Sequence, residues 1–466
     1  MDNMIIHLRK AVTRMRRRMQ PQYLIPISFL LAIFAGALLL LLPSATAAGE
    51  STDFRTALFT ATTSVCVTGL VTVDTFSHWS LLGKIIILVL IQIGGMGVIV
   101  ILSVVLLMMG RKLSLQGQIL LRESFNLETW SGLKAFVKRV CLGVAAVEGI
   151  GALLGLPVFV SRYGAVGIWY SVFHSISAFC NAGIDILGPD SLISYAGHPY
   201  LLSVTMLLIV LGGLGYVVWF DLLSALKETF ARKYTLRQLW SRLEEHTRLV
   251  LKVTSALIIG GMLIVLIAEW GNPGTLGALG YGSRFMGALF QSVTFRTAGF
   301  AAVPQQELTI PTCVAGYVLM FIGGSPIGTA GGVKTVTMVI VLSNAMSYIR
   351  GGQETVLCGR RVSEDLIRKS AAIITVSLVM TALMTALLCA VSAVPLEDST
   401  YEVVSALATV GLSRGVTPSL NAAGQWLIIL CMFLGRVGPI SMAVFFARPA
   451  VEPSGMRHAD GRFYAG

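Results

Sequence analysis

The sequence contains few charged residues: they make up 12% of its 466 positions, whereas hydrophobic residues make up 55%. A soluble globular domain carries about a quarter of its residues as charges. Common catalytic signatures are missing as well, since no HExxH, GxSxG or P-loop motif occurs and the six histidines are dispersed. These absences exclude an ordinary soluble domain, and we expect a membrane protein that is not an enzyme.

Cysteine is equally scarce. No two of the seven cysteines have the spacing of a metal or redox site, so we interpret them as small apolar packing residues. The segments between the apolar stretches are too short for a nucleotide-binding domain, and we expect no cofactor in this chain. Any control by a nucleotide would have to come from another chain.

Apolar stretches, by contrast, recur along the whole sequence. A helix needs roughly 20 residues to cross a hydrocarbon core of about 30 Å. The first stretch is interpreted as a retained span, because residues 45–47 form only a weak signal-cleavage site. Eight stretches are long enough to span a lipid bilayer, near residues 23–43, 81–109, 137–160, 200–225, 250–269, 311–347, 367–394 and 425–447.

The net charge of +12 is concentrated in alternate segments between these stretches. By the positive-inside rule, both termini and three basic loops then lie in the cytoplasm, which agrees with an even number of spans. We therefore interpret the charge as a topology signal of a multi-pass protein of the cytoplasmic (inner) membrane, with no nucleic acid as partner. Lys and Arg number six in residues 9–18, six in 111–139, seven in 227–252, five in 350–369 and three after 447.

Two landmarks recur four times in the same register. The first is a short stretch, too short to span and typical of a re-entrant pore helix, followed by a turn with a glycine. These glycines are separated by 114, 116 and 112 residues, and a glycine-rich landmark begins 25, 29, 24 and 24 residues after them. The short stretches are 53–63, 169–178, 284–294 and 400–408, and the turns are 64–70, 179–184, 294–300 and 408–412.

Every copy enters and leaves on the cytoplasmic side, so the copies are parallel, unlike the inverted repeats of many secondary transporters. We predict an all-α polytopic membrane protein with four parallel helix–pore loop–helix (M–P–M) repeats around a central pseudo-fourfold pore. The chain then divides into a basic N-terminal segment 1–20, repeats at 21–110, 111–230, 231–350 and 351–448, and a C-terminal tail 449–466.

Four turns that converge on one axis would direct carbonyl oxygens inward and replace part of the hydration shell of a cation. Glycine suits such a turn because it takes positive φ and lets the backbone approach the ion. The carboxyl ends of the pore helices would favour a positive charge. The alternative, that these glycines are ordinary helix-packing residues, is weakened by the four copies in register.

At these motifs the sequence resembles the Ktr/Trk/HKT superfamily of K⁺- and Na⁺-translocating proteins, and most closely the bacterial Ktr membrane subunit. TSVCVTGL, HSISAFCNAG, QSVTFRTAGF and ALATVGLSRG look like the four pore loops of that family, in order. The eight spans, without an extra N-terminal pair, are similar to the Ktr branch. The resemblance implies K⁺ transport, a homodimer of this subunit, and a cytoplasmic ring of RCK-type subunits that binds ATP, ADP or related nucleotides.

The resemblance also implies which residues form a K⁺ selectivity filter. A serine at the first filter glycine goes with Na⁺ selectivity in HKT relatives, and this position is Gly69 here, which favours K⁺. The implied filter residues are Val67, Thr68, Gly69, Asn181, Ala182, Gly183, Thr297, Ala298, Gly299, Thr409, Val410 and Gly411.

The sixth apolar stretch, 311–347, is too long for one span and contains the run GGSPIGTAGG. A proline removes a helix hydrogen bond and the glycines weaken the others, so we expect the helix to break at membrane depth rather than merely bend. The resemblance implies that the resulting loop acts as a gate. The implied gate residues are Gly323, Gly324, Ser325, Pro326, Gly328, Thr329, Gly331, Gly332 and Arg436.

Arg436 replaces a glycine of the second landmark in the other three copies. An arginine at membrane depth is costly unless it faces water or a partner, so we expect it to point into the pore. A structural role, as partner of a carboxylate or of loop carbonyls, remains the alternative. Arg296, inside the third turn, is interpreted either as a brace of the filter or as a solvent-facing side chain.

The outward segments are acidic, which can raise the local cation concentration, and Asp53 is also placed to cap the first pore helix. Two other functions remain open: a cation-coupled secondary transporter with alternating access, and a Na⁺-selective or Na⁺-permeable variant. The acidic residues are Glu50, Asp53, Asp74, Asp185, Asp190, Glu269, Glu307, Glu397, Asp398 and Glu402.

Overall fold

The computed structural model describes residues 21–97, 133–232 and 235–438. This part of the chain is mostly α-helical, with one antiparallel hairpin formed by β1 (Val356–Leu357) and β2 (Arg360–Arg361). The predicted N-terminal segment, most of the first basic loop and the C-terminal tail lie outside the described residues.

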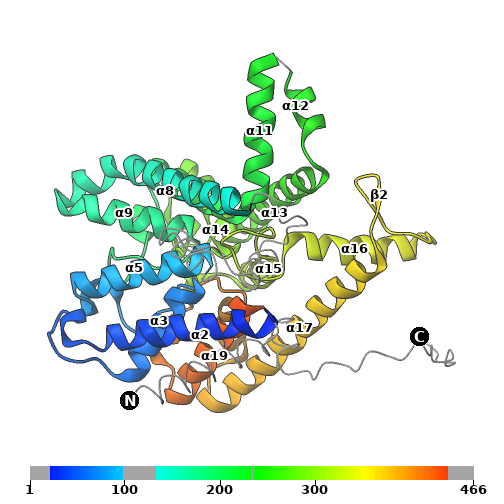
Figure 1. The fold of residues 1–466 in the computed structure, drawn as a ribbon. Helices are drawn as coiled ribbons and strands as arrows, with labels where there is room; N and C mark the ends of the chain where they lie inside the picture. Colours follow the sequence, from blue (N-terminus) through cyan, green and yellow to red (C-terminus); the bar gives the residue numbers. More distant parts are fainter. Residues whose placement is uncertain (1–20, 98–132, 233–234, 439–466) are drawn as a thin grey trace, which may run out of the picture.

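The helices follow one order four times (Figure 1). A long outer helix comes first, then a short helix that ends in a turn, then an inner helix. The outer helices are α2 (Pro21–Leu40), α8 (Leu133–Tyr163), α13 (Glu245–Glu269) and α17 (Glu364–Ser392). The short helices are α3 (Phe54–Cys66), α9 (Val166–Phe179), α14 (Tyr281–Phe295) and α18 (Leu396–Leu407). The inner helices are α5 (Leu81–Met96), α10 (Pro199–Leu214), α15 (Ile310–Phe321) and α19 (Ala422–Val437).

The inner helices begin at residues that favour a helix start. The Ser80 hydroxyl accepts a hydrogen bond from the Gly83 amide at 3.2 Å, and Asn421 Oδ1 accepts one from the Gly424 amide at 2.8 Å. Helix α10 has a proline at its first position, where no amide donor is needed. Asp53 does occupy the N-cap position of α3, but its carboxylate caps no amide there and instead lies 3.6 Å from Arg55 Nε.

Three helices in the described part of the chain are long and apolar enough to cross a membrane: Val137–Tyr163, Glu245–Glu269 and Glu364–Ser392. The first predicted span, 23–43, corresponds to the shorter apolar helix α2. Helices α5 and α19 cover the described parts of the second and eighth predicted spans, whose residues 98–109 and 439–447 lie outside the described residues. The sixth predicted span is divided, as expected, into α15 and α16 (Thr335–Ile349), with a loop between them.

The predicted span over residues 200–225 is present as two helices with a sharp bend between them. Helix α10 and helix α11 (Tyr216–Arg232) meet at Gly215 with a bend of 103°. Gly215 has φ +88°, and the Tyr216 amide donates to the carbonyl of Ile327, 3.0 Å away, rather than continuing α10. The second inner helix, α10, therefore ends at a break, as the third inner helix, α15, does.

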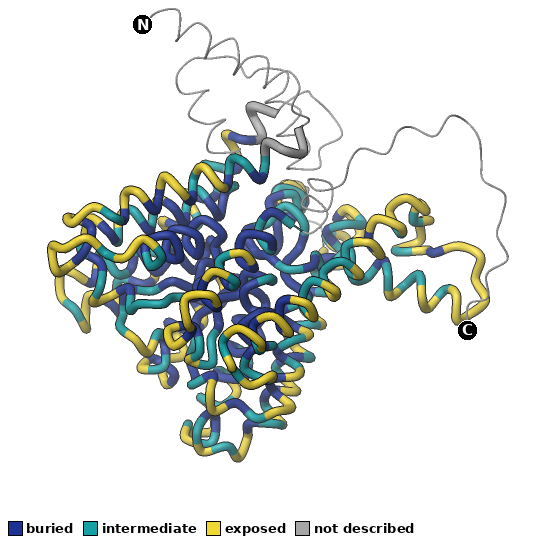
Figure 2. The backbone as a smooth tube through the Cα atoms, turned by 90° about the horizontal axis from the view of Figure 1, so that it is seen from below, coloured by how far each residue is buried: buried dark blue, intermediate teal, exposed yellow. Residues whose placement is uncertain are grey.

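The four groups of helices close into a ring. Each short helix packs against its own inner helix and against the inner helix of the preceding group, since α3 contacts α19, α9 contacts α5, α14 contacts α10 and α18 contacts α15. The carboxyl-terminal halves of the short helices are buried, whereas residues near their starts, such as Phe54, Tyr281 and Leu396, are exposed. Figure 2 shows buried backbone in the centre of the body and exposed positions at its periphery.

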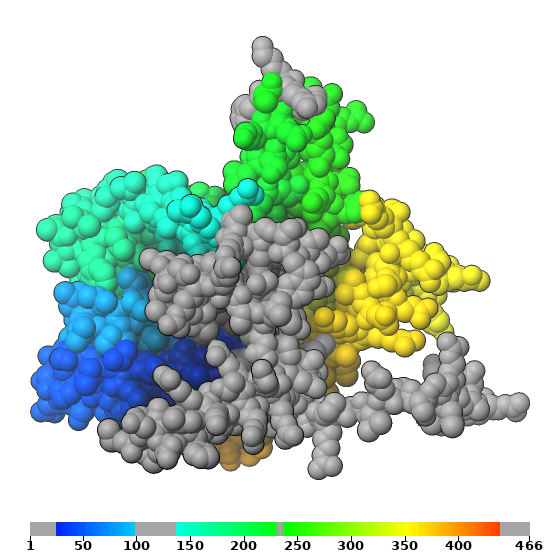
Figure 3. Space-filling model, viewed as in Figure 1, coloured from blue at the N-terminus to red at the C-terminus, as the bar shows by residue number. Residues whose placement is uncertain are grey.

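Two segments project from this body (Figures 1 and 3). One consists of α11 and α12 (Leu236–Arg242), joined by an ion pair of 2.8 Å between Arg242 and Glu228. The other consists of α16 and the β1–β2 hairpin. Arg360 of the hairpin lies 2.8 Å from Glu245 at the start of α13, so the two projections lie on the same side of the body.

Candidate functional site

The four turns share an unusual backbone conformation. Val67, Asn181, Thr297 and Thr409, each two residues before the turn glycine, have φ of +55°, +58°, +64° and +51°. Three of them are β-branched, and such residues adopt positive φ only where the surroundings impose it. Strain of this kind is concentrated at functional sites. The four glycines that follow also have positive φ, between +63° and +105°.

Hydroxyl groups behind the turns hold this conformation. The Gly69 amide donates to Thr63 Oγ1 at 2.9 Å, and the Gly411 amide donates to Ser405 Oγ at 3.1 Å. In the other two turns, Ser177 and Thr294 donate to backbone carbonyls just beyond the glycine. The turn amides thus point away from the centre. Among the described residues, no hydrogen bond ends on a carbonyl of the twelve predicted filter residues.

The turn glycines meet at the centre in cyclic order. A Cβ on Gly69 would lie 2.7 Å from the carbonyl oxygen of Ala182, and a Cβ on Gly183 would lie 2.7 Å from that of Ala298. The same holds for Gly299 against Val410, at 2.5 Å, while a Cβ on Gly411 would collide with the carbonyl oxygen of Thr68. Only glycine fits at these positions, and carbonyl oxygens of the kind that bind alkali cations surround one centre.

The loop between α15 and α16, residues 322–334, contains the predicted gate run 323–332 and contacts the second turn and the break in the second inner helix. Thr329 Oγ1 donates to Asn181 Oδ1 at 2.9 Å, and the Thr329 amide donates to the Gly212 carbonyl at 3.1 Å. The Ser325 amide donates to the Gly213 carbonyl at 2.9 Å. The loop is therefore fixed by hydrogen bonds rather than loosely placed.

The same loop also reaches the fourth turn. A Cβ on Gly331 would collide with the Thr409 hydroxyl and lie 2.6 Å from the Ala408 carbonyl oxygen. Gly328 has equally little room, with the Gly212 carbonyl oxygen 2.8 Å from a Cβ at its position. Glycine in this loop therefore permits close contact with the backbone of other groups. Gly323, Gly324 and Gly332 pack within the loop itself or against Gly213, and the Pro326 carbonyl lies against Gly215.

Arg436 connects the loop to the first group. Its Nη1 donates to the Thr329 carbonyl at 2.7 Å and its Nη2 to the Gly94 carbonyl at 2.5 Å. No carboxylate within the described residues pairs with it, so of the two partners considered for a structural role, loop carbonyls are the ones observed. The guanidinium group bridges two groups of helices directly beside the gate loop.

Arg296 is buried, with 8% of its surface exposed, so the solvent-facing interpretation is wrong. Its Nη2 donates to the Gly323 carbonyl at 3.0 Å, where the loop begins. The side chain thus fastens the third turn to the end of α15.

Lys334 is a residue of this site that the sequence interpretation did not identify. It ends the loop, and its Nζ donates to the Ala330 carbonyl at 2.7 Å. It is the only charged residue in the apolar stretch 311–347, and such a residue within an apolar stretch is itself a signal of function. Lys334 and Arg436 both line a cavity of about 710 Å³ between the loop, α17 and α19.

The outer acidic residues are largely engaged. Glu402 is fully buried and accepts a hydrogen bond from Thr417 Oγ1 at 2.6 Å, while Arg414 pairs with Glu397 at 3.0 Å and with Asp398 at 2.8 Å. Asp185 lies just beyond the second turn, and burial raises the pKa of its carboxyl group to about 6.

Comparison with known proteins identifies relatives that cover almost the whole chain. The model of the TrkH family, described as cation transport protein, matches residues 5–456. Ktr system potassium uptake protein B of Bacillus subtilis is 37% identical over 450 residues, which cover 96% of this chain and 97% of that protein. Potassium/sodium uptake protein NtpJ of Enterococcus hirae is 38% identical over 432 residues, 91% of this chain and 92% of that protein.

A solved structure shares the fold. The potassium transporter TrkH from Vibrio parahaemolyticus superimposes with a TM-score of 0.72 over 92% of this chain and 86% of that one, at 14% sequence identity.

Proposed function

The chain belongs to the TrkH family of cation transport proteins, and on this premise we propose that it takes up K⁺ across the cytoplasmic membrane. The path is a channel-like pore on the axis of four parallel M–P–M repeats, with both termini in the cytoplasm. The observation that carries this proposal is the cyclic contact of the four turns, in which each glycine faces a carbonyl oxygen of the next turn.

In this pore the turn residues form the selectivity filter. Their carbonyl oxygens accept no hydrogen bond from the described residues, and they take the place of water around K⁺. The carboxyl ends of α3, α9, α14 and α18 add partial negative charge to the same place. Because one close relative is named a potassium/sodium uptake protein, permeation of Na⁺ is the second candidate function.

The loop and Arg436 form the gate. The loop lies beneath the second and fourth turns, and the positive charge of Arg436 opposes a cation leaving the filter. Opening breaks the bonds of Thr329 to Asn181 and to Arg436, and the cavity of about 710 Å³ behind the loop gives it room to move.

The regulatory partner is a separate ring of RCK-type nucleotide-binding subunits, and the membrane subunit is a homodimer. The relatives named as parts of a Ktr system support the existence of further components. The two projections, α11–α12 and the segment from α16 through the β1–β2 hairpin, carry basic residues on one side of the body and provide the docking surface.

The test is K⁺ uptake by purified protein in liposomes, together with growth rescue of a K⁺-uptake-deficient cell at low K⁺, with and without Na⁺. We expect uptake by the wild type and a loss of K⁺ selectivity in Gly69→Ser, because a Cβ there meets the Ala182 carbonyl. Failure of the wild type to carry K⁺, despite correct insertion and a partner subunit, would overturn the proposal. Steady flux far above about 10³ ions per second would exclude alternating access.

A further inference from the structure

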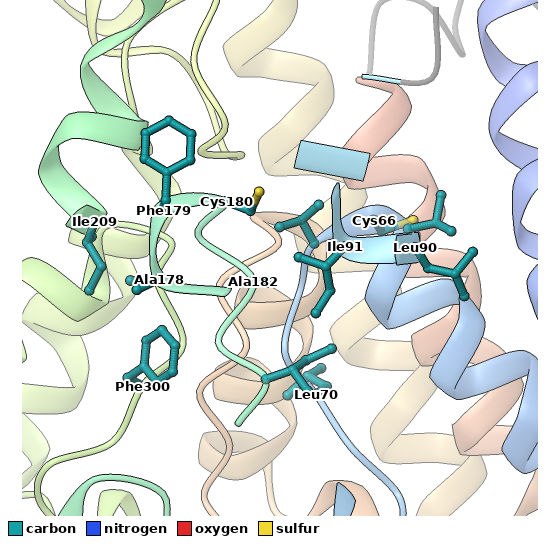
Figure 4. Close-up of a cluster of buried hydrophobic side chains, with 14 of the residues drawn as sticks. Cys66, Leu70, Leu90, Ile91, Ala178, Phe179, Cys180, Ala182, Ile209 and Phe300 are labelled. Atoms are coloured by element: carbon teal, nitrogen blue, oxygen red, sulfur yellow. The ribbon is translucent and has the colours of Figure 1, made fainter. Parts of the chain in front are cut away.

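A buried carboxylate lies behind the second turn. Glu148 of α8 has 8% of its surface exposed and accepts a hydrogen bond from Gln92 Nε2 of α5 at 3.2 Å. Cys180 Sγ lies 3.7 Å from Glu148 Oε1 and 3.7 Å from Gln92 Oε1. Three side chains from three different elements therefore form one polar cluster. Cys180 itself lies among buried apolar side chains (Figure 4).

The fold does not require this carboxylate. Ser175 Oγ donates to the Glu148 carbonyl at 2.6 Å, and in the third group Ser292 Oγ donates in the same way to the Ile258 carbonyl at 2.7 Å. Ile258 is therefore the structural equivalent of Glu148. Gln92 likewise has apolar counterparts, since the residues two positions before the landmark glycines of the other groups are Val210, Phe321 and Phe433.

The cluster is adjacent to the proposed ion path. Cys180 directly precedes Asn181, whose backbone has φ +58° and whose side chain accepts the hydrogen bond from Thr329 of the gate loop. Figure 4 shows Cys180 and Ala182 on the turn that follows Phe179, and Ile91 on the neighbouring helix α5. The carboxylate is thus separated from the filter backbone by one side chain.

The charges around the site are otherwise positive. Arg296, Lys334 and Arg436 all donate to backbone carbonyls, and none of them forms an ion pair with a described residue. Arg296 occupies the position in the third turn that Cys180 occupies in the second, three residues before the glycine. One turn is therefore backed by a guanidinium group and its neighbour by a carboxylate.

We propose that Glu148 is a positioning residue that sets the affinity of the pathway for its cation: its negative charge, held behind the second turn by Gln92 and Cys180, stabilises the ion at the Asn181 and Ala182 carbonyls. This inference rests on the proposed function, because it needs a cation at the turns. A purely structural role would require the hydrogen bonds of Glu148 but not its charge.

The experiment measures the dependence of K⁺ influx on K⁺ concentration in liposomes for wild type, Glu148→Gln and Glu148→Asp. Glutamine keeps the shape and most hydrogen bonds but removes the charge, so the half-saturating K⁺ concentration should rise about tenfold, with the maximal rate within about twofold of wild type. Aspartate keeps the charge and should shift the half-saturating concentration by less than about threefold.

Glu364→Gln is the control for the loss of one negative charge. Glu364 lies in the first turn of α17, where its exposed side chain is 3.5 Å from Arg368, and its loss of charge should leave K⁺ affinity unchanged. A Glu148→Gln protein that inserts normally and has wild-type affinity overturns the inference, as does an equal shift in Glu364→Gln. A wild type without K⁺ uptake would instead refute the proposed function.

A second variant covers the case in which Glu148→Gln does not insert. Gln92→Leu leaves the carboxylate in place but removes its donor on α5, and leucine matches the apolar residues at the equivalent positions. The half-saturating K⁺ concentration should then rise about threefold, because the charge is less firmly placed. An unchanged value in this variant would also overturn the inference.

Discussion

The four turns closely resemble one another, whereas the ends of the four inner helices do not. The turns are nearly alike, each with positive φ at two positions and a glycine against the next turn. The inner-helix ends differ. Gly97, Gly215 and Gly438 end α5, α10 and α19 with φ of +88°, +88° and +91°, but Pro326 occupies this position in the third group.

This difference has a simple physical cause. The proline ring holds φ near −65°, so residue 326 cannot take the positive φ with which glycine ends the other three inner helices. The chain instead leaves α15 as the loop that contacts Asn181 and Arg436. Likeness at the turns suits the proposed ion coordination, and the proposed gate lies where the third group differs from the other three.

The largest expected effect on K⁺ influx comes from replacing one of the four turn glycines, which makes that turn differ from the other three. In Gly411→Ala the new Cβ would collide with the Thr68 carbonyl, and the alanine would have to adopt a φ of +96°, which is unfavourable for any residue except glycine. K⁺ influx in liposomes should therefore fall at least about a hundredfold. Gly260→Ala on α13, where no atom lies within 4 Å of the new Cβ, is the control. Near-normal influx in Gly411→Ala would refute the close contact of the turns.

The next effect tests the helix ends. Arg436→Ala removes the positive charge of the guanidinium group and its hydrogen bonds to Thr329 and Gly94. Influx through the isolated subunit should therefore rise roughly fivefold. Arg436→Lys keeps the charge and should give an intermediate rate. An unchanged or lower rate in Arg436→Ala, with folding intact, contradicts the gating role.

A smaller increase is expected from the loop alone. Thr329→Val keeps the side-chain shape but removes the hydrogen bonds to Asn181 and Phe179, so influx should rise about twofold to threefold. Thr375→Val, at an exposed position of α17 that does not line the cavity behind the loop, serves as the control. If both variants change influx equally, the loop is not held in place by Thr329.

The smallest expected effect is a pH dependence of K⁺ affinity that arises from Asp185, which lies just beyond the second turn. Because burial raises the pKa of Asp185 to about 6, its carboxyl group is charged above this pH and becomes neutral below it. The half-saturating K⁺ concentration should therefore rise about twofold as the outside pH falls from about 7.5 to about 5.5. Asp185→Asn should abolish this dependence; a persistent dependence would assign it to another group.

The sequence predicted the parts of the molecule that repeat. The short helices lie within four residues of their predicted bounds, and the broken sixth stretch follows from the local chemistry of proline and glycine. The bend at Gly215 was missed because the signal for it, a carbonyl of Ile327 that accepts from Tyr216, lies in another group of helices.

The contacts between different groups of helices could not be predicted from the sequence either, because each partner lies far away along the chain. Nothing near Glu148 in the chain indicates that Gln92 and Cys180 lie beside it, and the Arg296–Gly323 bond joins residues 27 positions apart. Side chains such as Cys180 were interpreted by type as apolar packing, although its thiol contacts a carboxylate and an amide.

The cyclic contact of the turns occurs within one polypeptide. In a pore assembled from four identical subunits, one codon change alters all four positions at once. Here one codon change alters a single position, so Cys180 and Arg296 can occupy matching places in neighbouring turns and Pro326 can replace one glycine of four. A fused chain can therefore acquire selectivity and gating by separate mutations, each of which leaves three quarters of the ring unchanged.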